Sequence, residues 1–320
     1  MSQKSINNID KKVIKDFGNE WGNFDQSIIN DKDLIKAFNQ YFQIFPKNYL
    51  NKNMEGFDMG CGSGRWSKLI APKIKKLNCI DPSLEALNVA KKNLVNNKNI
   101  IFYNKSVNEK ILETESQDFG YCLGVLHHIS ETQKGIESCY KILKKNSPFL
   151  IYLYYRFDNK PLWFKIIWKL SDYFRKLISK LPFKIKKIVT FSIALIIYFP
   201  LAKISKLFNY FGFNVNNFPL SDYKNKTFYF MATDSLDRFG TKLEKRFTLR
   251  TSSNSSVLVP CKGFIKIEPM QFTRPLISLS SGIILENSRC STVLVKSITE
   301  YWASISLLKA ESFSSSLPIR

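Results

Sequence analysis

The feature that most constrains the fold is the regular alternation of short apolar runs and helix-like stretches across residues 55–155. A strand followed by a helix, repeated, places the strands in parallel, because each helix returns the chain to the same edge of the sheet. The pattern predicts a doubly wound α/β sheet with helices on both faces. The predicted strands are 56–59, 77–81, 99–103, 118–124 and 148–155. The predicted helices are 64–75, 83–96 and 131–144, with a short helix or loop near 108–116.

The segment FDMGCGSGRW places glycine at positions 60, 62 and 64, between the first predicted strand and its helix. Three glycines let the backbone turn tightly with no side chain above it, and the helix that follows offers free N–H groups to a ligand. A dinucleotide fingerprint reads GxGxxG. Here the third glycine comes one residue early, so a dinucleotide fits poorly.

An acidic residue lies at the end of the second predicted strand. Asp81 follows Gly60 by 21 residues, and a carboxylate at this strand tip can accept both hydroxyls of a ribose. The two features together predict a nucleoside-bearing ligand at the carboxyl edge of the sheet. Each alone has a structural alternative, a glycine turn or a helix cap. Pro82 and Ser83 suit the start of the next helix, with Ser83 as its cap.

Three segments, DMGCGSGRW, IDPS and DFGYCLGVLHHI, carry a family resemblance. The chain resembles the class I S-adenosylmethionine-dependent methyltransferases, and is most similar to the branch with small-molecule, quinone and lipid substrates (methyltransferase domain type 11). The resemblance covers roughly residues 55–155. It implies S-adenosylmethionine as cofactor and a Rossmann-like, mainly parallel seven-stranded sheet. Such a sheet ends in an antiparallel hairpin, which here must come from the tail, with Gly263–Glu268 as one candidate strand.

The resemblance also implies which residues hold the cofactor. Asp58 would fix the glycine loop, Asp81 would hold the ribose, and Pro82 would flank the adenine. Ser106 and Val107 stand where the family often has an acid followed by a small residue, so serine is a departure. The full set of cofactor-binding positions implied is Trp21, Asp58, Gly60, Cys61, Gly62, Gly64, Asp81, Pro82, Ser106, Val107 and Gly124. Trp21 resembles an N-terminal element that closes over the site.

His127 and His128 are the only histidines of the chain. An imidazole titrates near neutrality and can accept a proton from a hydroxyl or an acidic carbon. His128, at the end of the fourth strand, is the candidate base, and the alternative is a histidine that shapes the loop through backbone hydrogen bonds. The six cysteines are scattered without a CxxC pair, so no metal site is expected.

Residues 158–248 differ in composition from the core. Thirteen Lys or Arg fall within 158–226, interleaved with aromatic residues. The apolar run 188–199, closed by Pro200, is 12 residues long, and a bilayer needs about 20. We therefore expect a buried helix or a helix in a membrane interface. In the family that the core resembles, segments inserted after the fifth strand shape the acceptor pocket. The resemblance therefore implies a helical lid over the acceptor, either resting on an anionic membrane or packing as an ordinary cap. Asp234, Asp237 and Arg238 are candidates to face the acceptor.

Four regions are predicted: an N-terminal helical cap (1–50), the cofactor-binding core (51–157), the basic helical insert (158–248) and a tail (249–320). The tail holds 16 serines in 72 residues. It either completes the sheet or reflects a change of reading frame.

The net charge of +22 is compatible with nucleic acid or an anionic membrane. The abundance of lysine, 39 against 9 arginines, explains it equally well. The sequence predicts a cytoplasmic methyltransferase for a small or lipid-like acceptor, peripheral to the inner membrane face if the insert binds lipid. An RNA methyltransferase and a module that binds the cofactor without reacting are the alternatives.

Overall fold

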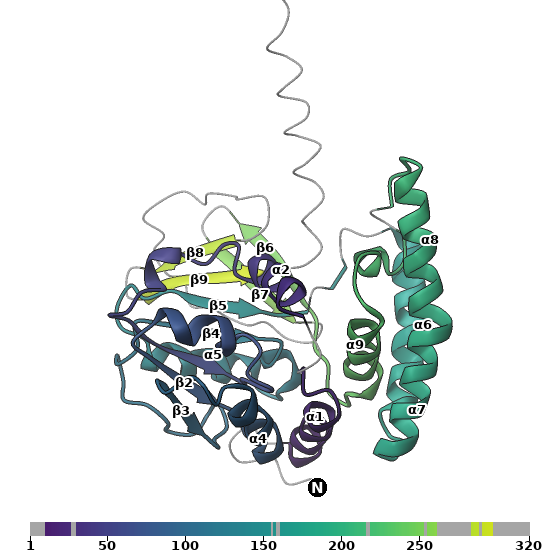
Figure 1. The fold of residues 1–320 in the computed structure, drawn as a ribbon. Coiled ribbons are helices and arrows are strands. Elements are labelled where there is room, and N and C mark those ends of the chain that lie inside the picture. The colour runs from purple at the N-terminus through teal and green to yellow at the C-terminus, as the bar shows by residue number, and fades with distance from the viewer. Residues whose placement is uncertain are drawn as a thin grey trace, which may run out of the picture.

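The computed structural model describes residues 10–26, 30–154, 156–157, 161–215, 218–252, 255–260, 283–287 and 290–296. An α/β core occupies one side of the molecule, and a group of long helices stands beside it (Figure 1). Five parallel strands form the core sheet, in the order β3-β2-β1-β4-β5. They are β1 Glu55–Met59, β2 Lys76–Ile80, β3 Ile100–Tyr103, β4 Phe119–Leu123 and β5 Phe149–Tyr152. The predicted doubly wound, mainly parallel sheet is confirmed for these five strands.

Two strands of the tail lie beside β5. In the structure β9 (Cys290–Lys296) pairs in parallel with β5, and β8 (Ile283–Asn287) pairs antiparallel with β9. A separate antiparallel ribbon joins β6 (Phe247–Ser252) to β7 (Ser255–Pro260). The predicted strand Gly263–Glu268 lies outside the described residues.

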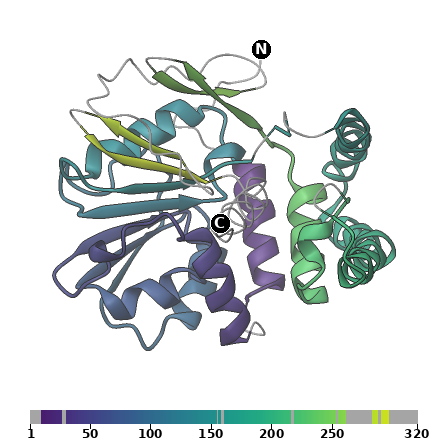
Figure 2. The same ribbon diagram turned by 90° about the horizontal axis from the view of Figure 1, so that it is seen from above.

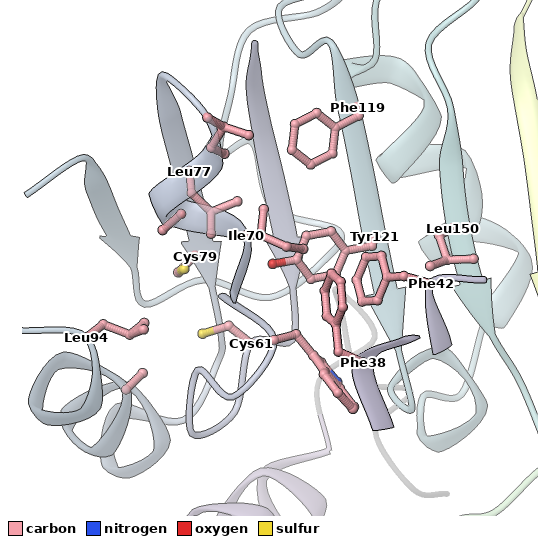
Figure 3. Close-up of a cluster of buried hydrophobic side chains, with 14 of the residues drawn as sticks. Phe38, Phe42, Cys61, Ile70, Leu77, Cys79, Leu94, Phe119, Tyr121 and Leu150 are labelled. Carbon is pink, nitrogen blue, oxygen red and sulfur yellow. The ribbon is translucent and has the colours of Figure 1, made fainter. Parts of the chain in front are cut away.

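Helices cover both faces of the sheet. One face packs against α2 (Asp31–Tyr41), α3 (Ser67–Ile70) and α4 (Leu84–Asn93), through side chains such as Phe42, Ile70 and Leu94 (Figure 3). The other face packs against α5 (Thr132–Ile142), through Ile136 and Cys139. Strand side chains alternate between the two layers, as a sheet buried on both sides requires.

Local capping fixes the helix starts. Asp10 accepts hydrogen bonds from the backbone of Lys12 and Val13 at the start of α1 (Lys11–Asn23). Ser83 caps α4 as predicted, with its Oγ 3.3 Å from the Ala86 nitrogen. The predicted helix 64–75 is shorter than expected. It consists of α3 and a 3-10 turn, Ala71–Lys73, because Pro72 lacks the N–H that continued α-helical bonding needs.

The remaining helices follow β5 and form a separate layer. These are α6 (Leu162–Ile178), α7 (Phe183–Ile193), α8 (Phe199–Tyr210) and α9 (Phe228–Gly240). Both views place α9 between the core side, where α1 lies, and the outer helices α6, α7 and α8 (Figures 1 and 2). The short 3-10 helices are Lys47–Tyr49, Leu126–His128 and Ser221–Tyr223.

The expectation that Pro200 ends the apolar helix is wrong. A π-helical turn, Ala194–Tyr198, joins α7 to α8, so the helix runs unbroken from Phe183 to Tyr210 over 28 residues. The wider turn directly before Pro200 gives its ring room and changes the hydrogen bonding that the proline would otherwise break. By length and composition alone, this one helix among the described residues could cross a membrane.

Candidate functional site

The glycine loop connects β1 to α3 and adopts the predicted tight turn. Gly60, Gly62 and Gly64 have φ of +77°, +54° and +77°, a region that favours glycine. The nitrogens of Gly60 and Cys61 both donate to the Ile80 carbonyl, at 2.7 and 3.1 Å, which ties the loop to the tip of β2. The three glycines are therefore required by the backbone conformation itself.

Asp81 lies directly after β2 and holds the loop in place. Its Oδ2 accepts from the Gly62 nitrogen and its Oδ1 accepts from the Ser83 nitrogen, both at 2.9 Å. The carboxyl group is buried, and burial raises its pKa to about 6. Each carboxylate oxygen has two lone pairs, so both oxygens can still accept a hydroxyl of a ribose.

Asp58 belongs to a buried polar network under the loop. Its Oδ2 accepts from Ser67 Oγ at 2.6 Å, and Ser67 Oγ lies 3.2 Å from Cys79 Sγ and 3.3 Å from the Tyr121 hydroxyl. Burial raises the pKa of Asp58 to about 7. Figure 3 shows Cys79 and Tyr121, which are also part of the hydrophobic cluster on this face of the sheet. Asp58 thus connects β1 to Ser67, the first residue of the helix that follows the loop.

A hydroxyl of the loop lacks a partner. Ser63 Oγ is buried and makes no hydrogen bond within the described part of the chain. Asn93 of α4 reaches the same segment, donating from Nδ2 to the Ser63 carbonyl at 2.9 Å. A buried hydroxyl without a partner is costly unless a ligand or water satisfies it. The loop is therefore equipped to hydrogen-bond a bound molecule.

The predicted adenine side is held by polar contacts. Asn104 Nδ2 donates to the carbonyls of Asp81 and Pro82, at 3.1 and 3.0 Å. The Ser106 nitrogen donates to Glu109 Oε2 at 2.6 Å, and Val107 is buried in the α5 layer. Sequence reasoning missed Asn104 and Glu109, because neither stands in one of the recognised segments.

Gly124 follows β4 and faces open space. Its φ is +83°, and a Cβ built there would meet nothing within 4 Å. The neighbouring Val125 instead covers Gly60, where a Cβ would lie 2.3 Å from Val125 Cγ2. The ends of β1 and β4 therefore meet beside an open position, the arrangement that a ligand at the carboxyl edge of the sheet needs.

Trp21 of α1 lies on the glycine loop as predicted. A Cβ on Gly62 would approach the Trp21 indole to 2.9 Å. Arg65 extends this cover, with its guanidinium 5.8 Å from the Trp21 ring and 4.5 Å from the Trp66 ring. The N-terminal helix thus closes one side of the loop with an aromatic and cationic surface.

The structure brings His128 and Asp237 together, although 109 positions separate them. His128 Nδ1 lies 2.7 Å from the Leu243 carbonyl oxygen, so Nδ1 carries the proton and donates it. His128 Nε2 lies 3.7 Å from Asp237 Oδ1, and no described residue hydrogen-bonds to Nε2. The Tyr154 hydroxyl donates to Asp237 Oδ2. Burial raises the pKa of Asp237.

Of the three acceptor-facing residues predicted on α9, only Asp237 lies at the histidine. Asp234 Oδ2 is 3.9 Å from Lys226 Nζ. Arg238 pairs with Glu244 at 3.3 Å. Sequence reasoning also missed Glu20, a buried acid of α1 whose pKa is raised by burial and by the nearby Asp237 and Asp234 carboxylates.

No group of three or more His, Cys, Asp or Glu side chains in the described ranges is placed to hold a metal ion. Asp237 instead lies beside His128, and Asp58 and Asp81 are buried next to the glycine loop. Such an arrangement can hold a nucleoside-bearing ligand at the loop and accept a proton beside it.

Comparison with known proteins agrees with this chemistry. The sequence model of the family described as "Methyltransferase domain" matches residues 57–151. A ubiquinone biosynthesis O-methyltransferase of Nitrosomonas europaea is 31% identical over 106 residues, which are 30% of this chain and 45% of that relative. The chain therefore matches less than half of the relative's length.

Solved structures are similar at a lower level. The YcgJ protein from Bacillus subtilis has 18% identity and a TM-score of 0.37, with 46% of this chain and 60% of that chain covered. Phosphoethanolamine N-methyltransferase 1 of Haemonchus contortus, solved with phosphoethanolamine and S-adenosylhomocysteine, has 14% identity and a TM-score of 0.35. The match covers 42% of this chain and 31% of the Haemonchus chain. Because these TM-scores are low, the solved structures carry no argument about function.

Proposed function

We propose that this protein is an S-adenosylmethionine-dependent enzyme that methylates a small or lipid-like acceptor, because residues 57–151 match the model of a methyltransferase domain and resemble part of an O-methyltransferase. The observation that carries the proposal is the glycine loop with three positive φ angles, locked by the Asp81 carboxylate through the Gly62 nitrogen. Bare backbone beside a carboxylate at the tip of β2 suits the adenosyl part of the cofactor.

The residues of the site are compatible with S-adenosylmethionine. Asp81 would accept the ribose hydroxyls, and the buried Ser63 hydroxyl would gain the partner it lacks in the described chain. Gly124 would leave room for the cofactor at the end of β4, where a side chain would project into open space. Trp21 would cover the bound molecule from α1. When bound, this cofactor supplies an activated methyl group that needs only an aligned acceptor.

We propose that the acceptor atom is a hydroxyl oxygen. His128 Nδ1 is occupied by the Leu243 carbonyl, so Nε2 holds a lone pair that can take the hydroxyl proton. The resulting imidazolium would be stabilised by the Asp237 carboxylate, which lies 3.7 Å away. The Tyr154 hydroxyl would keep Asp237 oriented through its own hydrogen bond. The name of the Nitrosomonas relative, an O-methyltransferase, supports an oxygen acceptor.

The proposed division of the chain follows from the same reasoning. Residues 1–50 cap the site, 51–157 hold the cofactor and 158–248 shape the acceptor side. Strands β8 and β9 would complete a seven-stranded sheet within the tail 249–320. Sequencing the gene across codons 245–255 tests this: a shift of frame there would exclude the tail from the native fold.

Calorimetric titration tests cofactor binding. We expect the full chain to bind S-adenosylmethionine and S-adenosylhomocysteine, and not NAD. Asp81→Ala should weaken both affinities at least tenfold, whereas the exposed control Glu113→Gln should leave them unchanged. A folded chain that binds neither S-adenosylmethionine nor S-adenosylhomocysteine would contradict the proposal.

Turnover with a methyl-labelled cofactor and a panel of phenolic and lipid acceptors tests the base. His128→Ala should lower turnover at least tenfold while cofactor affinity stays near normal. Unchanged turnover removes His128 from the mechanism. If RNA added to the same assay became labelled and no small acceptor did, the result would favour the alternative function of an RNA methyltransferase.

A further inference from the structure

The outer helices carry most of the large exposed apolar side chains in the part of the chain whose burial is described. We call α6 and the continuous helix Phe183–Tyr210 the helical pair. Of the 25 large hydrophobic side chains that are exposed among the residues with described burial, 21 lie between positions 162 and 213. Leu162 is 74% exposed, Ile196 is 71% exposed and Ile188 is 67% exposed. A water-soluble monomer seldom exposes so large an apolar face, so this face indicates a partner.

The long helix has the opposite pattern to that of a helix in a water-soluble protein. Its fully buried positions recur at intervals of three or four residues, and none is Leu, Ile, Val or Phe. These positions are Lys186, Thr190, Ala194, Tyr198, Ala202 and Ser205. A surface helix normally turns its apolar stripe inward and its polar face outward. Here the small and polar residues face inward, and isoleucine, leucine and phenylalanine face outward.

The inner face of the helical pair is already occupied by α9. Ser235 of α9 donates to the Thr190 carbonyl at 2.8 Å. Tyr198 is buried in a cluster with Met231 and Phe239 of α9. Arg175 of α6 donates to the Thr241 carbonyl at 2.9 Å, just after α9. The outward face is therefore the part of the pair that is left for a partner (Figure 2).

The charges favour an anionic lipid surface as that partner. Residues 162–213 contain ten Lys or Arg and a single acid, Asp172. Lys184 and Lys187 precede the charge-free stretch 188–202, and Lys203 and Lys206 follow it. Lysines beside an anionic membrane contribute about 1 kcal/mol each, and their long stems can reach the headgroups from an embedded helix. A protein interface core, in contrast, is depleted of lysine.

Trp163 and Tyr210 suit the same surface. They lie at the start of α6 and the end of α8, and they are 44% and 83% exposed. Both rings prefer the boundary between headgroups and hydrocarbon, because one part of each is apolar and another is polar. α6 and the long helix run in opposite directions (Figure 1), so both residues lie away from the turn that joins the two helices.

The helical pair is unsuited to crossing the membrane. The charge-free stretch is 15 residues long, or about 22 Å of helix against about 30 Å of hydrocarbon. A spanning helix would also carry α9 into the lipid, together with Asp237 and the buried Lys186 at its contacts. A helix with one face covered by protein along its length can instead lie in the plane of one leaflet.

We infer that the helical pair is a monotopic membrane anchor, which lies flat in an anionic leaflet with its outward apolar face in the acyl boundary. Anionic lipids are typical of the cytoplasmic leaflet of a cell membrane. The anchor places α9, and with it Asp237, between the membrane and the α/β core. This placement, together with the proposed function on which it rests, identifies the acceptor class. The acceptor would be an amphiphilic hydroxyl compound held in the bilayer.

Vesicle flotation of the full chain tests the anchor. We expect the protein to float with vesicles of phosphatidylglycerol and phosphatidylcholine, and much less with phosphatidylcholine alone. The variant Ile188→Glu/Leu195→Glu/Ile196→Glu should reduce the floating fraction at least tenfold. The matched control Val95→Glu/Ile101→Glu changes exposed apolar residues of the core and should float like the unchanged chain. Flotation of the triple variant at the unchanged level, or no flotation of the unchanged chain, overturns the inference.

Cysteine labelling distinguishes an in-plane anchor from a spanning helix. Lys180→Cys and Phe211→Cys introduce exposed thiols at opposite ends of the long helix. An impermeant maleimide added outside the vesicles should label both, above the background of the unchanged chain. Labelling of only one end would show a spanning helix. A discrete dimer without lipid, which the triple variant dissociates, would show that a second copy covers the face instead.

Calorimetry with S-adenosylmethionine separates this inference from the proposed function. The triple variant should keep the cofactor affinity of the unchanged chain, because the three side chains point away from the core. Loss of flotation with retained cofactor binding supports the anchor alone. Loss of both properties in this variant would show general unfolding. Flotation is then measured with the less disruptive variant Leu195→Ser, after circular dichroism has shown that this variant is folded.

Discussion

The buried carboxyl group of Asp58 gives the chain a specific pH dependence of stability. Asp58 is 2% exposed on β1, and burial is the largest cause that raises its pKa from 3.8 to about 7. The hydrogen bond from Ser67 Oγ opposes this rise, because it favours the carboxylate, but burial prevails. The folded chain therefore holds a proton over a pH range in which the unfolded chain has already released it.

The sign and the size follow from linkage. Because the pKa is higher in the folded state, the contribution of Asp58 to the free energy of unfolding is complete below pH 4 and is lost as the pH rises through 7. A difference of about 3 pKa units, at 1.36 kcal/mol each, corresponds to about 4 kcal/mol. Asparagine has nearly the same shape, can still accept from Ser67, and has no proton to lose. Asp58→Asn should remove this part of the pH dependence.

Urea unfolding followed by circular dichroism, at intervals between pH 4 and pH 8, measures the effect. The variant should gain about 4 kcal/mol relative to the unchanged chain from the lowest to the highest pH. The control Glu113→Gln changes a carboxyl group that is 78% exposed and should give a curve parallel to that of the unchanged chain. A parallel curve for Asp58→Asn would refute the reasoning, since it would mean that Asp58 is ionised and paired in the folded protein.

Four further predictions concern the site. Gly62→Ala should destabilise the chain by about 1–3 kcal/mol more than Gly124→Ala in urea unfolding, because both need a positive φ but only the first meets a side chain, Trp21 at 2.9 Å. Gly124→Ala should instead weaken S-adenosylmethionine binding by calorimetry, and an unchanged affinity would exclude a ligand above Gly124. Trp21→Ala should weaken cofactor binding several-fold, whereas the control Trp163→Ala should not. Asp237→Asn should lower kcat at least tenfold with little change in KM; equal kcat would leave Asp237 without a role in catalysis.

The strands and the glycine loop were predictable because their determinants are local. The run that ends at Asp81, for example, combines β-branched and apolar residues with a Pro-Ser helix start, and Ser83 caps α4 as expected. Positive φ at Gly60, Gly62 and Gly64 follows from the glycines themselves. Such features depend on a few neighbours in the chain, and a single sequence contains all the information they need.

The acidic side of the site was only partly predictable, because it is assembled from distant segments. Asp237 was one of three candidates on α9, and nothing in the sequence of the helix separates it from Asp234. The choice is made by the orientation of α9, which brings Asp237 to His128 and Tyr154. Glu20 has no signal in the sequence, since an acid in an amphipathic helix normally faces water.

The apolar helix is longer than its sequence predicts, because it continues through Pro200. A proline inside a helix removes one hydrogen bond and presses on the preceding turn, so ending the helix there is the usual expectation. The π-helical turn Ala194–Tyr198 resolves this conflict in three dimensions. No residue pattern in the segment indicates a π turn, whereas the lysines on either side mark where the apolar surface ends.

Helix α1 contacts the glycine loop, the His128 region and α4, and so connects these parts of the site. At one end of the helix, Trp21 lies on the glycine loop. In its middle, Phe17 lies 4.9 Å from the His128 ring. Gly18 packs so closely on α4 that a Cβ would lie 2.5 Å from Ser83 Oγ.

The fourth contact of α1 reaches the helical pair. Asp16 Oδ2 lies 3.1 Å from Lys186 Nζ, and the lysine side chain is 2% exposed. A buried lysine that loses its partner is left as an uncompensated charge, which costs about 3–5 kcal/mol. Asp16→Asn should therefore loosen the helical pair from α1. Because the same helix bears Phe17 and Trp21, we expect this variant to weaken cofactor binding as well as stability.

Lys186→Met, which removes the charge together with its need for a partner, should restore much of the stability to Asp16→Asn. A double variant no more stable than Asp16→Asn would show that Asp16 acts on α1 alone.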